Sequence, residues 1–168
     1  MRRILVSCAV VGVLALPAAA IARSSAPAKP GYVVVSKAVG NGGVNGSPVI
    51  RLVVRGFVLG RVAQEGQVEI RQIPEVSGQG SPEATPGVTT TRIKWGKRFT
   101  GSNFRFRAMG GLYSVVIRGT GVYLFAGGKG SIKVQGSSYV RPDGTYSING
   151  GRARSLPKRL VTRKIGGG

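Results

Sequence analysis

The residue types that most often perform chemistry in proteins are scarce in this chain of 168 residues. The sequence has no histidine, and its single cysteine is Cys8. It has 25 lysines and arginines but only five carboxylates, which are Glu65, Glu69, Glu75, Glu83 and Asp143. General bases, nucleophile partners and metal ligands are drawn mainly from the missing types. The composition therefore favours a non-enzymatic protein that uses no cofactor and no metal.

A hydrolase built on Glu69 or Asp143 is the enzymatic alternative. A glycosidase needs two carboxylates roughly 5–10 Å apart. Glu65 and Glu69 are four residues apart in an expected strand, which would separate them by about 13 Å unless Gly66 forms a bulge. The sequence does not define the distance from Glu69 to Asp143, no serine–lysine pair is marked, and no cluster of oxygen ligands suggests calcium. Solvated surface acids are the favoured interpretation.

The glycine-rich stretch Gly127–Ser131 suggests a phosphate-binding loop but departs from that motif. A Walker loop has serine or threonine directly after its lysine, whereas Gly130 follows Lys129. The motif should also lead into a helix, and the residues from Ser131 onward alternate like a strand. We therefore expect a glycine hairpin at this position.

The first 22 residues have the features of an export signal. Arg2 and Arg3 form a short basic region, an uncharged apolar run extends from Ile4 to Leu16, and Pro17 follows. Ala20 and Ala22 supply the small residues of an A-x-A cleavage site before Arg23. Cleavage would remove two basic residues and no acid, leaving 146 residues with a formal charge of +18. The protein is therefore expected to be secreted or associated with the cell envelope.

Three other interpretations of the N-terminus remain open. The 19 residues from Ile4 to Ala22 are close to the length of a membrane anchor. The segment ending at Cys8 resembles a lipobox, although most of the apolar run lies after it. The pair Arg2 and Arg3 faintly resembles a twin-arginine signal. The proline and the A-x-A ending favour cleavage on the general secretory route.

After the signal peptide, the sequence predicts a flexible linker over residues 23–31, a β-domain over 32–151 with a long surface loop at 74–88, and a basic C-terminal tail over 152–168. Frequent glycines and a two-residue alternation predict an all-β antiparallel sandwich or barrel of roughly seven to nine short strands. The expected strands lie near Tyr32–Lys37, Val49–Leu59, Arg61–Ile73, Thr89–Trp95, Asn103–Ala108, Leu112–Arg118, Gly121–Phe125, Ser131–Gln135 and Thr145–Ile148.

The aromatic residues fall mainly at positions that the alternation assigns to the core. Phe104 and Phe106 point one way in the pattern, while Arg105 and Arg107 point the other way. The residues expected in the core on this basis are Phe57, Trp95, Phe104, Phe106, Tyr113, Tyr123, Phe125 and Tyr146.

One segment carries a resemblance. The stretch GGLYSVVIRGTGVYLFAGGKGSIKVQG, followed by DGTYSINGG and SLP, lies between Gly110 and Pro157. It resembles segments of small secreted all-β proteins of high-GC Gram-positive bacteria that have no assigned activity. The resemblance covers about a third of the chain and implies an exported β-domain, without implying any site residue.

The basic residues are the strongest functional feature of the sequence. Eight of them fall on the expected outward side of strands: Arg51, Arg55, Arg92, Lys94, Arg105, Arg107, Arg118 and Lys133. A basic surface serves solubility in many proteins, but this charge far exceeds that need. It favours binding to an anionic cell-envelope polymer or to lipid head groups, although no specific nucleic-acid motif is present. The alternative is a structural module that assembles through strand edges.

Overall fold

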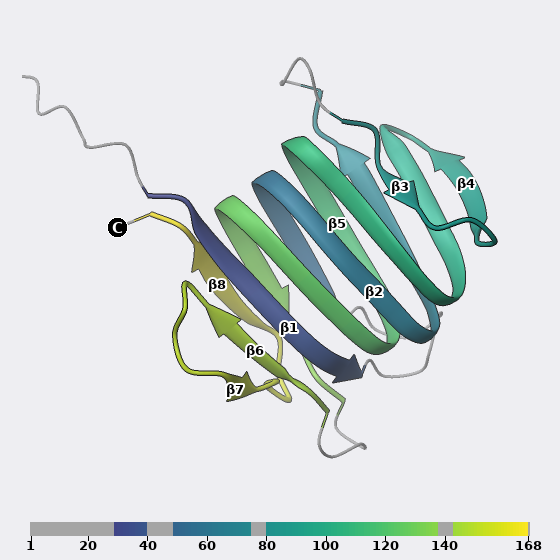
Figure 1. The fold of residues 1–168 in the computed structure, drawn as a ribbon. Helices are drawn as coiled ribbons and strands as arrows, with labels where there is room; N and C mark the ends of the chain where they lie inside the picture. The colour runs from purple at the N-terminus through teal and green to yellow at the C-terminus, as the bar shows by residue number, and fades with distance from the viewer. Residues whose placement is uncertain (1–28, 40–48, 75–79, 138–142, 168) are drawn as a thin grey trace, which may run out of the picture.

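The computed structural model describes residues 29–39, 49–74, 80–137 and 143–167, which form strands and connections without a helix. Eight strands make one open antiparallel sheet (Figure 1), which confirms the all-β antiparallel prediction. Within the described part, no helix is long and apolar enough to cross a membrane. The expected signal peptide, its cleavage residues Ala20 and Ala22, and Cys8 lie outside the described residues.

Two of the strands are far longer than the sequence predicted. In chain order, the strands are β1 (Gly31–Val39), β2 (Ile50–Gln72), β3 (Glu83–Ala84), β4 (Thr89–Ile93), β5 (Gly96–Val134), β6 (Thr145–Ile148), β7 (Arg154–Ser155) and β8 (Val161–Ile165). β2 has 23 residues and β5 has 39, so the expectation of short strands is wrong for most of the sheet. β6 has the predicted bounds.

The long strands β2 and β5 wind around each other into a coil. Every part of β2 outside Ala63 and Gln64 pairs with β5, and most of it pairs with β5 on both edges. Val115 of β5, for example, pairs with Leu52 on one side and with Ile70 on the other. The sheet therefore returns to itself after each turn of the coil, as the stacked loops of ribbon in Figure 1 show.

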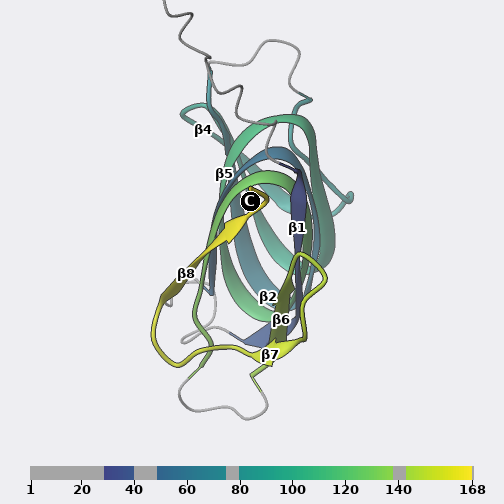
Figure 2. The same cartoon turned by 90° about the vertical axis from the view of Figure 1, so that its left-hand side faces the viewer.

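The coil is flattened, so its strand segments form two walls that face each other across the core (Figure 2). The β8 wall contains, in order, β8, β5 (130–134), β2 (50–56), β5 (111–118), β2 (66–72), β5 (96–102) and β4. The β1 wall contains, in order, β7, β6, β1, β5 (122–127), β2 (57–62), β5 (104–108) and β3. The two walls are successive passes of one continuous sheet.

Glycines mark the bends at which β5 passes between the walls. They recur every nine residues, at Gly101, Gly110, Gly119 and Gly128. At Gly128, φ is +134°, and a Cβ would collide with the carbonyl oxygen of Arg55. Only glycine tolerates both this dihedral and this close approach of two backbones. Nine residues of strand span about 30 Å, which sets the width of a wall.

Inward-facing side chains of both walls fill one apolar core. β2 contributes alternate residues, among them Ile50, Leu52 and Val54 in the β8 wall and Val58 and Val62 in the β1 wall, all buried. The buried aromatic residues are Phe99, Phe104, Phe106, Tyr113 and Tyr146. The even spacing of inward residues along β2 continues through its bends, so a single strand lines the core of both walls.

Tyr113 ties the core to the bend at Gly110. Its single hydroxyl proton is shared between two acceptors, the carbonyl oxygen of Met109 at 2.5 Å and that of Gly80 at 2.8 Å. Burial raises the pKa of this phenol above its usual value of 10.0, while the hydrogen bond to Met109 opposes the increase. The hydroxyl thus holds the chain at residue 80 against the turn between the walls.

Three residues expected in the core are exposed instead. Tyr123 and Phe125 face outward from the β1 wall, because the inward positions of that segment belong to Val122, Leu124 and Ala126. Trp95 is 58% exposed, because Lys94 and Trp95 form the turn between β4 and β5, where the φ of Trp95 is +65°. Phe57 is half-buried on the outer side of the β1 wall.

Two segments expected outside the sheet contribute strands to it. The predicted surface loop at 74–88 contains β3, which pairs with Arg107 and Phe106. The predicted basic tail at 152–168 contains β7 and β8, and Ile165 of β8 is fully buried. The β-domain thus extends beyond residue 151.

Candidate polyanion-binding surface

The structure divides the eight predicted site residues among three places. Arg51, Arg55, Arg118 and Lys133 face outward from the β8 wall. Arg105 and Arg107 face outward from the β1 wall, on the opposite side of the core. Arg92 and Lys94 lie at the end of the coil, in β4 and in the turn after it. The eight residues therefore do not form one patch.

The outer side of the β8 wall brings together the larger set of cations. Across neighbouring strands, one line of paired residues runs through Lys133, Arg51, Val116, Glu69 and Arg98. We call this surface the basic face and define it by Arg51, Arg55, Arg71, Arg98, Arg118, Lys129 and Lys133, with Glu69 among them. Its members come from β2 and from three separate passes of β5.

Two pairs of like charge lie directly opposite each other on the basic face. Arg51 of β2 pairs with Lys133 of β5, and Arg55 pairs with Lys129. All four residues are exposed, and none of them has a carboxylate partner among the described residues. Like charges opposed across two strands are destabilising, so the sheet forms despite these pairs. A local violation of this kind is expected where a surface serves binding.

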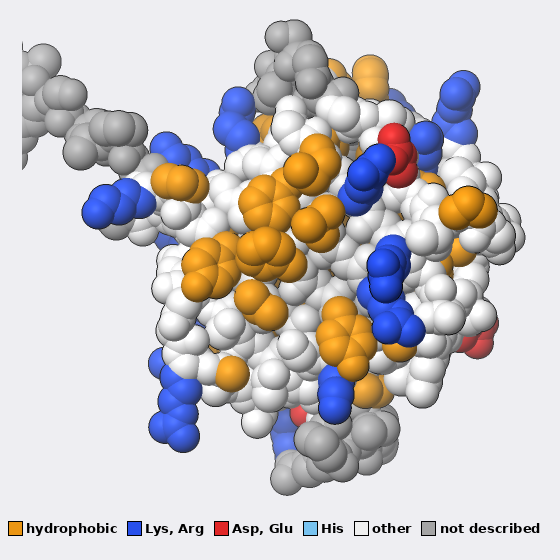
Figure 3. Space-filling view, viewed as in Figure 1, with side chains coloured by type: hydrophobic (Ala, Val, Ile, Leu, Met, Phe, Trp, Pro, Cys, Tyr) orange, Lys and Arg blue, Asp and Glu red, His pale blue; other side chains and the backbone are white. Residues whose placement is uncertain are grey.

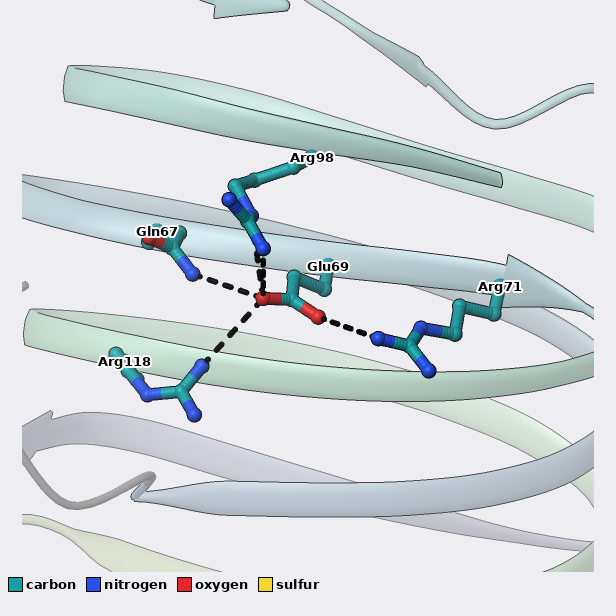
Figure 4. A network of polar contacts seen from close by, with 5 residues as sticks. All are labelled: Gln67, Glu69, Arg71, Arg98 and Arg118. Carbon is teal, nitrogen blue, oxygen red and sulfur yellow. Dashed lines mark hydrogen bonds and ion pairs between the residues drawn. The ribbon is translucent and has the colours of Figure 1, made fainter. Parts of the chain in front are cut away.

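The other half of the basic face is organised around Glu69 (Figure 4). Its carboxylate accepts hydrogen bonds from Arg98 Nε at 3.2 Å, Arg71 at 3.3 Å and Gln67 Nε2 at 3.1 Å, and Arg118 lies 3.8 Å away. The side chain of Glu69 is 11% exposed, although it points to the outer side of the sheet, because these neighbours cover it. Three guanidinium groups thus already share one internal anion.

The basic residues of the β1 wall are arranged differently. Arg107 forms a two-pronged ion pair with Glu83 of β3, at 2.9 and 2.7 Å, so its charge is neutralised locally. Arg105 lies opposite Arg61, whose guanidinium donates a hydrogen bond to Asn103 Oδ1 at 2.8 Å. This wall therefore has one pair of opposed cations, whereas the basic face has two.

Glu69 and Asp143, the two acids considered for a hydrolase, lie in different surroundings within the described part of the chain. Glu69 is held by three arginines on the β8 wall. Asp143 is buried at the β1 wall, where its carbonyl oxygen accepts a hydrogen bond from Val39 and its side chain lies against Gly136. Among the described residues, no group of three or more acids, histidines or cysteines could hold a metal ion.

The stretch Gly127–Ser131 is part of β5 and does not form the expected hairpin. It pairs with β2 along its length while the chain bends at Gly128. This bend places Lys129 opposite Arg55 on the basic face.

Sequence reasoning missed three members of the basic face, which are Arg71, Arg98 and Lys129. Arg71 and Arg98 meet at Glu69 although they lie 27 positions apart. The nine-residue recurrence of glycine in β5 is the signal that could have located them, because it defines which segments face which wall.

Comparisons with known proteins returned no relative of this chain. No family model matches it, and searches of curated proteins and of solved structures found no match.

Proposed function

We propose that this protein is an exported, non-enzymatic binding protein that holds a linear polyanion on the basic face of its β8 wall. The observation that carries the proposal is the presence of two directly opposed cation pairs, Arg51 with Lys133 and Arg55 with Lys129, on adjacent strands. They lack carboxylate partners among the described residues, so an external anion would relieve their repulsion.

The geometry of the pairs favours a polymer over a small anion. Arg51 and Arg55 are four residues apart on β2, which places the two pairs about 13 Å from each other along the strands. Ser131 and Val53 lie between them and carry no charge. A chain of repeated phosphates or carboxylates could engage both pairs at once and release several counterions.

Glu69 limits where the polymer binds. Its carboxylate occupies the position at which Arg71, Arg98 and Arg118 would otherwise meet an external anion. The polymer is therefore expected to bind mainly over the unpaired cations of β2 and β5, with the Glu69 cluster as a weaker extension of the same surface.

Export places this surface where anionic envelope polymers occur. Cleavage after Ala22 is part of the proposal and rests on the A-x-A ending and the apolar run before it. N-terminal sequencing of the exported protein should give Arg23 as the first residue. A retained Met1, or a lipid attached to Cys8, would contradict this part of the proposal.

The proposed site is tested by binding to long-chain inorganic polyphosphate over a range of salt concentrations. The logarithm of the binding constant should fall linearly with the logarithm of the salt concentration. The double variant Arg51→Gln/Lys133→Gln should reduce the magnitude of the slope by roughly 1.5, because each lost phosphate contact contributes about 0.7–0.9.

The matched control is Arg61→Gln/Arg105→Gln on the β1 wall. It removes the same charge and also relieves one directly opposed pair. Under the proposal, this control keeps the slope of the parent and loses only a small amount of affinity through the change in net charge. Equal losses in both variants would mean that the polymer responds to overall charge, and the basic face would not be its site.

A second function, assembly through strand edges, is favoured by β4. Among the residues that the structure describes, this strand pairs only with β5, and Thr89, Thr90 and Thr91 are exposed. An unpaired edge offers backbone groups to another chain. Self-association that persists at high salt and is lost when Thr90 is replaced by proline would support assembly over polymer binding.

A further inference from the structure

The outer side of the β1 wall carries an apolar patch in place of a basic one. We define the patch by Tyr32, Val34, Phe57, Leu59, Tyr123 and Phe125, which come from β1, β2 and β5. Tyr32 and Phe125 are both 41% exposed, and Leu59 is 37% exposed. Figure 3 shows apolar side chains gathered on the face that Figure 1 presents, where β1 lies in front, with basic side chains beside them. Large contiguous apolar surfaces usually mark a contact with a partner or a membrane.

The patch is packed as one unit. Val34, Phe125 and Leu59 lie directly opposite one another on three neighbouring strands. The ring of Phe125 meets the rings of Tyr32 and Phe57 edge to face, with centroids 6.0 and 5.2 Å apart. The ring of Phe57 in turn lies over Gly127, where a side chain would displace it. The rings therefore form a continuous apolar surface and do not present parallel faces to a stacked base or sugar.

Cations border this patch on one side. Arg61 lies opposite Tyr123, and Arg105 lies opposite Arg61. Between the patch and β3 lies a groove of about 420 Å³, whose lining includes the apolar residues Leu59, Ala84 and Phe106 together with Arg105 and Arg107. The only acid in this groove, Glu83, is paired with Arg107. An apolar floor beside guanidinium groups matches a ligand whose apolar part is attached to an anionic group.

Charge decides between the possible occupants. A second copy of the exported chain would bring a formal charge of +18, so the two copies would repel each other. An anionic polymer would satisfy the cations but would leave the apolar side chains in water. An anionic lipid bilayer satisfies both requirements, because phosphates lie directly above an apolar layer.

We propose that the β1 wall docks on an anionic lipid bilayer, with the apolar patch at the level of the head groups and Arg61 and Arg105 on lipid phosphates. The Tyr32 and Tyr123 hydroxyls suit this depth, because tyrosine combines an apolar ring with a polar tip. The groove beside Arg105 receives the head group of one lipid. This proposal concerns the opposite wall to the basic face, so each of the two stands or fails separately.

Vesicle binding tests the role of the patch. The full exported protein is mixed with vesicles of phosphatidylcholine and phosphatidylglycerol, or of phosphatidylcholine alone, and the bound fraction is measured by sedimentation. Binding should require the anionic lipid. The double variant Leu59→Ser/Phe125→Ser should weaken it at least about tenfold, because two partly exposed apolar side chains no longer enter the bilayer.

The matched control is Val53→Ser/Val116→Ser, which removes two apolar side chains from the outer side of the β8 wall. It should bind vesicles as the parent does. Unchanged circular dichroism spectra show that both double variants fold. If the Leu59 and Phe125 variant binds as tightly as the parent, the apolar patch does not face the bilayer and the proposal is wrong.

Fluorescent reporters determine the orientation without relying on weakened binding. The only tryptophan of the chain, Trp95, is exposed in a turn with positive φ and is replaced by asparagine, which tolerates that dihedral. Phe125→Trp and Val53→Trp then place one reporter on each wall, at positions with 41% and 42% exposure. On anionic vesicles, the emission of the Phe125→Trp reporter should shift to shorter wavelength and be quenched by brominated lipid, while that of the Val53→Trp reporter should not change.

Two results would overturn the proposal. The first is a shift at position 53 without one at position 125, which would place the bilayer on the other wall. The second is a dimer, measured by light scattering without lipid, that is abolished by Leu59→Ser/Phe125→Ser, because the patch would then be covered by a second copy.

Discussion

The β8 wall and the β1 wall are built from the same two strands, but their outer surfaces differ in kind. Along β2, the outward residues Arg51 and Arg55 belong to the β8 wall, and Leu59 belongs to the β1 wall. Inward residues are similar throughout, because Leu52 and Val58 enter one shared core. The fold therefore depends on the inward positions and leaves the outward positions free to differ. The outer side of each wall can therefore differ without disturbing the core, and we propose a different partner for each.

The two outer surfaces are also unfavourable in the unbound protein for different reasons. The basic face sets like charges opposite each other, which lowers stability until an anion binds. The apolar patch is stable in its ring contacts but exposes apolar area to water. Binding would relieve electrostatic repulsion at one wall and remove apolar surface from water at the other. Added salt should therefore weaken binding at the basic face more than binding at the apolar patch.

The largest expected effect comes from breaking the bend that joins the walls. Gly128→Val should destabilise the protein by at least about 3 kcal/mol, because it combines an unfavourable positive φ with a collision against the Arg55 carbonyl. Gly87→Ala is the control, since Gly87 also has a positive φ but a Cβ added there would meet no atom within 4 Å. It should cost about 1 kcal/mol in urea unfolding. Equal costs at both positions would mean that the bend is not sterically fixed.

Glu69→Gln should separate stability from binding on the basic face. Removing the shared anion leaves Arg71, Arg98 and Arg118 without their partner, and we expect a loss of about 1–2 kcal/mol after allowing for the exposure of these arginines. Polyphosphate should bind more tightly, because an external anion no longer competes with Glu69. Weaker polyphosphate binding in a folded Glu69→Gln protein would contradict the internal-anion interpretation.

Tyr113→Phe tests the connection between core and bend. Loss of the hydrogen bonds to Met109 and Gly80 should cost about 1 kcal/mol at neutral pH. Burial raises the pKa of Tyr113 in the folded state, so its stabilisation is complete below pH 10 and disappears as pH rises through the folded-state pKa. Urea unfolding across this alkaline range should show a fall in the parent that is smaller in Tyr113→Phe. Identical alkaline profiles would rule out the contribution of this phenol.

The smallest effect is a gain in stability. Arg51→Gln/Lys133→Gln should stabilise the free protein by about 0.2–1 kcal/mol, because it removes a directly opposed pair of like charges. The gain should be greatest at low salt and should shrink as salt screens the repulsion. A loss of stability at low salt would show that the pair contributes favourable packing, and the argument from repulsion would fail.

The sequence predicted which side of a strand each residue faces better than it predicted how the strands continue through the bends. Alternation correctly placed Phe104 and Phe106 inside and Arg105 and Arg107 outside, because a strand has a period of two residues. It failed across the bends, where Asn103, Gly110 and Gly121 adopt positive φ and the inward register of β5 shifts by one residue. Tyr123 and Phe125 lie just beyond the bend at Gly121, so the alternation places them in the core although they face outward.

The basic face was predicted in part for the same reason. The outward direction of Arg51, Arg55, Arg118 and Lys133 follows from alternation within their own strands. Their distance from Arg105 and Arg107 follows from the coil, which alternation within a strand does not reveal. The cluster at Glu69 joins residues from three strand segments, and only the pairing register brings them together.

The most direct test of the two-wall account is the recruitment of labelled polyphosphate to anionic vesicles, which repel this polymer in the absence of protein. The account predicts that the parent protein carries polyphosphate into the vesicle pellet. Leu59→Ser/Phe125→Ser should weaken vesicle binding at least about tenfold but leave polyphosphate binding in solution unchanged. Arg51→Gln/Lys133→Gln should bind vesicles as the parent does and carry less polymer into the pellet. If vesicles and polyphosphate instead compete for the protein, so that each displaces the other, both bind one surface and the account is contradicted.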